Sequence, residues 1–72
     1  MKKRFKMENL DCANCAAKME AAIRALPGVN DASISFMTQK LTLDADDARF
    51  AEILAAAQKC CDRVDKGTRI VV

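Results

Sequence analysis

The spacing of apolar residues switches between two periods along the chain, and this alternation constrains the fold most strongly. Apolar and polar residues alternate over 4–10, which predicts a strand. They alternate again over 29–37 and, after Thr38-Gln39, over 41–43, which predicts a hairpin. Over 15–26 and 50–64 the apolar residues recur every three or four positions, as on one face of a helix. Residues 68–72 are rich in β-branched side chains and predict a closing strand.

Signals for helix ends flank both predicted helices. Pro27-Gly28 follows the first helix and Lys66-Gly67 follows the second. The acidic segment 44–47 precedes the second helix, where aspartates cap the helix N-terminus and complement its dipole. This segment lacks the glycine and the spacing of a calcium loop, so we predict capping rather than hard-cation binding.

The resulting order is strand, helix, strand, strand, helix, strand. It matches the ferredoxin-like βαββαβ arrangement, an α+β fold with a four-stranded antiparallel sheet and both helices on one face. We expect residues 1–72 to form one domain with a thin core that includes Met7 and Met19, because so short a chain buries only about 60% of its extended surface. The chain ends inside its last predicted strand, and we expect it to be a domain excised from a longer protein.

Composition excludes several classes of function. No apolar run reaches about 18 residues, so we predict no membrane insertion of this segment. The basic start lacks the apolar stretch of a secretory signal, which predicts a cytoplasmic location or the cytosolic face of a membrane transporter. The net charge is +2 and no aromatic ladder accompanies the basic residues, so we predict no nucleic-acid binding.

The chain has four cysteines and no export signal, so metal or redox chemistry is a better interpretation than a disulfide scaffold. Cys12 and Cys15 lie where the first predicted strand passes into the first helix, and a helix N-terminus stabilises thiolates. Residues three apart in a helical turn have Cβ atoms about 5 to 6 Å apart, so both sulfurs can reach one ion at about 2.3 Å. This spacing predicts a chelating pair.

Two segments, NLDCANCAAKME at 9–20 and LPGV at 26–29, make the chain similar to the heavy-metal-associated domain family. The resemblance implies a ferredoxin-like fold and metal binding by Cys12 and Cys15. It also places the chain among copper metallochaperones, mercury-binding proteins and the amino-terminal domains of soft-metal P-type ATPases. Asn9-Leu10 stands where many members have Gly-Met, and this departure is mild because Leu can fill the position of Met in the core.

The residue before the first cysteine bears on the choice of metal. An acid at this position, Asp11, resembles the zinc, cadmium and lead exporters more than the copper carriers. Two thiolates and a carboxylate total −1 around a divalent ion but −2 around Cu(I), and Zn²⁺ takes about four ligands. We therefore predict Asp11 as a third ligand, with Zn²⁺, Cd²⁺ or Pb²⁺ favoured over Cu⁺. The alternative is that Asp11 is a solvated loop residue or a helix cap.

Cys60 and Cys61 are unusual for the family and fall near the end of the second predicted helix. The resemblance places that end beside the metal-binding loop, so both are candidate extra ligands. Neighbouring Cα atoms lie about 3.8 Å apart, too close for the usual disulfide between them. Cys61 lies in the middle of the apolar face and Cys60 at its edge, so the alternative interpretation is that Cys61 is a small core residue.

Three functions compete at this point. The first is a non-enzymatic domain that captures Zn²⁺, Cd²⁺ or Pb²⁺ and passes it to a membrane metal ATPase, either within the same chain or as a partner. The second is a Cu(I) metallochaperone, which needs only the two motif cysteines. The third is a thiol-disulfide oxidoreductase, which would want a longer chain and a proline facing the dithiol. We expect a monomer, with a metal-linked dimer as the alternative.

Overall fold

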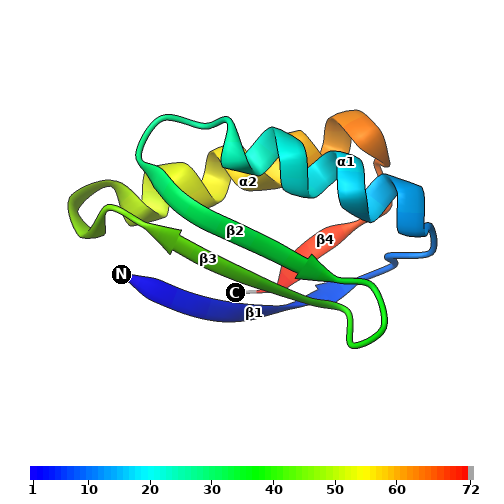
Figure 1. Cartoon of the computed structure of the whole chain (residues 1–72). Coiled ribbons are helices and arrows are strands. Elements are labelled where there is room, and N and C mark those ends of the chain that lie inside the picture. The colour runs from blue at the N-terminus through cyan, green and yellow to red at the C-terminus, as the bar shows by residue number, and fades with distance from the viewer. Residues whose placement is uncertain (72) are drawn as a thin grey trace.

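The computed structural model describes residues 1–71 and has the predicted order of elements (Figure 1). Four strands, two α-helices and one 3₁₀ turn make up these described residues. Their bounds are β1 Lys2–Glu8, α1 Ala13–Arg24, β2 Val29–Ser35, β3 Lys40–Ala45, η1 Asp47–Arg49, α2 Phe50–Val64 and β4 Arg69–Val71. Within this described part of the chain, no helix has both the length and the apolar character that crossing a membrane requires.

The strands form one sheet in the order β2-β3-β1-β4, and every neighbouring pair is antiparallel. Both helices cover the same face of this sheet, as Figure 1 shows. The predicted ferredoxin-like fold is therefore confirmed. The start of α1 and the end of α2 lie at the same end of the molecule, where the β2–β3 turn also lies (Figure 1).

Several element boundaries differ from the predicted ones. The alternation predicted a strand through Met37, but β2 ends at Ser35 and residues 36–39 form the turn, with Gln39 at a positive φ of 53°. The aspartates before α2 were predicted to cap a helix start, and the Asp46 carboxylate accepts a hydrogen bond from the Ala48 backbone N–H at 3.3 Å. This cap begins the 3₁₀ turn η1 rather than α2 itself.

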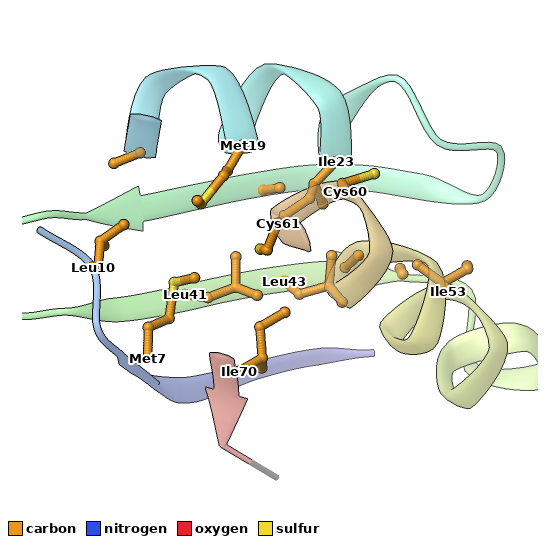
Figure 2. Packing of buried hydrophobic residues seen from close by; sticks show 14 of the residues in the cluster. Met7, Leu10, Met19, Ile23, Leu41, Leu43, Ile53, Cys60, Cys61 and Ile70 are labelled. Atoms are coloured by element: carbon orange, nitrogen blue, oxygen red, sulfur yellow. The ribbon is translucent and has the colours of Figure 1, made fainter. Parts of the chain in front are cut away.

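The core lies between the sheet and the helix pair (Figure 2). Met7 and Met19 are 1% and 0% exposed, so their predicted place in the core is confirmed. Gly28 has a φ of 87°, and a Cβ atom there would come within 2.9 Å of Ile53 Cδ1. A glycine is required at this turn because both the backbone conformation and the approach of α2 disfavour a side chain.

The outer face of the sheet, opposite the helices, carries an unfavourable cross-strand pair. Lys6 on β1 and Lys40 on β3 are direct partners in the antiparallel register, so both ammonium groups project from the same face. Like charges in such a pair repel each other.

Lys40→Glu is expected to raise the free energy of unfolding by about 0.5 kcal/mol, because it replaces repulsion with attraction. Urea denaturation measures the change, and Lys40→Arg, which keeps the charge, is the matched control. Equal stability of both variants would contradict a repulsive pair.

Candidate metal site

Cys12 and Cys15 lie at the start of α1. Cys12 is the N-cap residue, and its Sγ accepts a hydrogen bond from the Cys15 backbone N–H at 3.2 Å. The Cys12 carbonyl oxygen accepts a further bond from the Ala16 N–H at 3.0 Å. Both thiols are free and half-buried. The structure therefore brings the predicted pair together at the helix N-terminus, although α1 begins at Ala13 rather than at Cys15.

The two thiols of the pair have different proton affinities. A side-chain hydrogen bond with Cys15, followed by the Cys15 backbone N–H, lowers the pKa of Cys12, and the charge of Lys18 adds to this effect. The same side-chain hydrogen bond, followed by desolvation, raises the pKa of Cys15, and the charge of Asp65 raises it further. The pair therefore favours a thiolate on Cys12 with the proton on Cys15, and binding of a metal ion by both sulfurs releases the remaining proton.

Side chains from distant segments hold the loop that carries the pair. Gln39 Nε2 donates a hydrogen bond to the Leu10 carbonyl oxygen at 2.7 Å. Thr68 Oγ1 donates to the Asn9 carbonyl oxygen at 3.1 Å, and Asn9 Nδ2 donates to the Gly67 carbonyl oxygen at 3.1 Å. The β2–β3 turn and the connection between α2 and β4 thus restrict the conformations of the loop before any ion arrives.

The structure explains why this chain can have Asn9-Leu10 where many members of the similar family have Gly-Met. Asn9 has a φ of 61°, in the left-handed region. Glycine adopts this region freely, and asparagine tolerates it better than most other non-glycine residues do. Leu10 is 0% exposed and belongs to the core cluster. Both substitutions therefore preserve the conformation and the packing of the loop.

Asp11 is exposed and stands directly before the pair. The alternative in which Asp11 caps the first helix is wrong, because Cys12 occupies the N-cap position. Over residues 1–71, no group of three or more His, Cys, Asp and Glu side chains is placed to hold one ion. A carboxylate ligand from Asp11 therefore requires the loop to close around the ion.

Cys60 and Cys61 lie in the last part of α2, which ends near the start of α1 (Figure 1). They are 7% and 0% exposed, and Figure 2 shows Cys61 among the core side chains. Burial is the main cause that raises the pKa of the Cys61 thiol to about 11. The structure favours the core interpretation of Cys61. Ligation by either residue stays a prediction, which the Cd²⁺ affinity of a variant with serine at both positions would test.

Asp65, which sequence reasoning missed, is the C-cap residue that follows α2. Its carboxylate accepts a hydrogen bond from the Gly67 backbone N–H at 3.0 Å, and it lies close enough to Cys15 to raise the pKa of that thiol. Its position near the pair follows from the packing of α2 against α1. The proximity of Asp65 to Cys15 cannot be predicted from the spacing of residues in the sequence, because the two residues lie in different elements.

Comparison with known proteins relates the chain to metal transporters. Residues 4–61 match the family model of the heavy-metal-associated domain. The zinc/cadmium/lead-transporting P-type ATPase of Shigella sonnei (strain Ss046) is 46% identical over 55 residues, which are 76% of this chain and 8% of that protein. Copper-transporting ATPase 1 of Rhizobium meliloti (strain 1021) is 44% identical over 39 residues, which are 54% of this chain and 5% of that protein.

A solved structure agrees over almost the whole chain. The N-terminal domain of ZntA in the apo-form superimposes with a TM-score of 0.73 at 34% identity, and the match covers 99% of this chain and 92% of that one. The chain therefore corresponds in length to a single domain of that size and to only a small part of the ATPases that it matches.

Proposed function

Because the chain belongs to the heavy-metal-associated domain family, we propose that it captures Zn²⁺, Cd²⁺ or Pb²⁺ between Cys12 and Cys15 for a metal-exporting P-type ATPase. One observation carries the proposal: two free, half-buried thiols lie together at a helix N-terminus. Hydrogen bonds from Gln39 and Thr68 hold the loop that carries them. The domain itself binds metal and is not catalytic. We further propose that residues 1–72 are the cytosolic amino-terminal domain of such a transporter, consistent with the zinc/cadmium/lead-transporting relative.

Transfer of the ion follows from the exposure of the pair. The metal ion is the cargo of the domain, and two sulfurs leave part of its coordination shell open. An incoming thiolate of the acceptor forms a new metal–sulfur bond, and one of the two original bonds then breaks. The sulfur that is released takes up a proton.

The preference for a divalent ion depends on Asp11. A carboxylate added to two thiolates leaves a total charge of −1 around Zn²⁺ or Cd²⁺ but −2 around Cu(I). The larger negative charge is costly because the metal-binding loop is only partly hydrated. Asp11 is exposed and directly precedes Cys12, and its carboxylate turns toward the ion as the loop closes around it.

Asp11→Ala is expected to weaken Zn²⁺ binding roughly tenfold or more while it leaves Cu(I) binding nearly unchanged, because only the divalent site uses the carboxylate. Competition titrations with chromophoric chelators measure both affinities. Asp62→Ala, which removes an exposed carboxylate on α2, is the matched control. Equal losses for the two ions would show that Asp11 does not select the metal.

A Cu(I) metallochaperone or copper ATPase domain is the second candidate, favoured by the 44% identity to copper-transporting ATPase 1 of Rhizobium meliloti. Native mass spectrometry of the chain with Zn²⁺, Cd²⁺, Pb²⁺ and Cu(I) in competition distinguishes the two candidates. Retention of a divalent ion in the presence of Cu(I) at matched free concentrations supports the proposal, and exclusive loading with Cu(I) contradicts it.

A further inference from the structure

The outer face of the sheet carries a group of cations without carboxylate partners. In the register, Lys6 lies opposite Lys40, and Arg4 is the partner of Thr42 on the same pair of strands. Across residues 1–71, none of these three cations lies within 4.0 Å of a carboxylate, since the ion pairs of that part involve the amino terminus, Arg24 and Arg49. Glu8 and Asp44 lie on the same face at its two ends, so the cations predominate only around the Lys6–Lys40 pair, where the two ammonium groups repel each other.

Hydroxyl groups lie beside two of these cations, Arg4 and Lys40. A shallow hollow of about 210 Å³ lies on this face, and its lining contains no carboxylate. The lining residues are Arg4, Ser33, Ser35, Thr38, Lys40 and Thr42. Ammonium, guanidinium and hydroxyl groups are all hydrogen-bond donors to phosphate oxygens, so this surface is complementary to phosphate-bearing ligands.

An exposed apolar tip adjoins the cations. The β2–β3 turn contains Met37, which is 89% exposed, and Phe36, which is 36% exposed. Thr38, the next residue of the turn, lines the hollow. A basic surface with large apolar side chains at its margin is typical of proteins that lie on an anionic bilayer. An acidic protein partner would account for the cations but not for a methionine that contacts almost nothing within its own domain.

We propose that Arg4, Lys6, Lys40 and the turn at 36–39 form a membrane-contact surface that binds anionic phospholipid bilayers. The cations and hydroxyls contact headgroup phosphates, and Met37 enters the boundary between headgroups and acyl chains. This contact also positions the metal loop, because Gln39 of the same turn donates a hydrogen bond to Leu10 at 2.7 Å and accepts one from the Met7 N–H at 2.8 Å. The thiol pair then lies beside the bilayer and is not covered by it.

Co-sedimentation of the metal-free domain with phosphatidylcholine vesicles, with and without phosphatidylserine, tests the proposal. We expect binding only to the vesicles that contain phosphatidylserine, and weaker binding as salt is added. A variant with glutamine at both Lys6 and Lys40 should lose roughly 25-fold in partition coefficient, because each cation near an anionic surface contributes roughly fivefold. The substitutions remove a repulsive pair, so the variant is expected to fold at least as well as the native chain.

Two further variants make the test specific. Replacing Lys59 and Arg63 of α2 by glutamine removes the same charge from the helix layer and should leave vesicle binding nearly unchanged. Met37→Ser should weaken vesicle binding at least about threefold without a change in stability, because the native side chain is 89% exposed.

Three outcomes would overturn the proposal. The first is equal binding to neutral and anionic vesicles, and the second is an equal loss in the two double-glutamine variants. The third is binding to a soluble polyglutamate peptide that depends on Lys6 and Lys40 without binding to vesicles, which would assign the face to an acidic protein. A variant with serine at Cys12 and Cys15 should still bind vesicles, so this surface and the proposed metal capture can fail independently.

Discussion

Replacement of both Cys12 and Cys15 by serine is expected to lower the affinity for Cd²⁺ by at least about a thousandfold, because a neutral hydroxyl does not replace a thiolate as a ligand for a soft ion. The ultraviolet thiolate-to-Cd²⁺ charge-transfer absorption should disappear together with the affinity. Isothermal titration calorimetry and absorption spectroscopy measure the two effects.

The fold should survive this double substitution. Cys12 Sγ caps α1 by accepting a hydrogen bond from the Cys15 N–H, and a serine hydroxyl oxygen is a favoured N-cap acceptor. Circular dichroism and the unfolding transition should therefore be close to those of the native chain. Cd²⁺ bound by this variant with native affinity would refute the assignment of the site.

The pair of substitutions at Cys60 and Cys61 is the informative contrast. With alanine at both positions, the affinity for Cd²⁺ should remain within a small factor of the native value, although stability falls because core atoms are removed. A large loss of Cd²⁺ affinity from a folded variant would instead identify one of them as a ligand.

Raising the pH above 9 is expected to destabilise the domain through Cys61. Burial raises the pKa of this thiol from 9.0 to about 11, so in this range the native state keeps a proton that the unfolded chain has lost. The stabilising contribution of the neutral thiol is complete below the unfolded pKa and is lost as the pH rises through the folded pKa. For a shift of this size the loss is about 2 kcal/mol by pH 11.

Urea denaturation at a series of pH values measures this effect as a slope. Cys61→Ala is less stable at every pH, but its stability should fall less steeply than that of the native chain between pH 9 and 11. Parallel curves for the two chains would show that Cys61 does not titrate with the fold. Alkylation gives a second readout, because iodoacetamide should modify the half-buried Cys12 and Cys15 long before Cys61.

Much of the fold was predictable because the periodicity of apolar residues is a local property. Side chains on one face of a helix or a strand must recur with the period of that backbone, so the positions of the core residues identify the elements. The ends of elements were predicted less well. The alternation extends through Phe36, but the chain turns there, since β2 pairs with β3 only as far as Ser35 and Lys40.

The candidate site was predictable in part for the same reason. The spacing of Cys12 and Cys15 is a local pattern, and its position between a strand and a helix could be inferred from the order of elements. Gln39, Thr68 and Asp65 escaped prediction because their partners are distant in the sequence, with Gln39 and Leu10 separated by 29 positions and Thr68 and Asn9 by 59.

The amino-acid sequence by itself determined the order of the elements, the dithiol motif and the acidic residue before it, since each depends on neighbouring residues and on backbone periods. Only the tertiary structure decided that Cys12 caps α1, that Cys61 is a core residue with a raised pKa, and that Lys6 faces Lys40 across two strands. These features depend on burial and on contacts between segments far apart in the chain. Such contacts form only when the sheet and the helix pair close around one core.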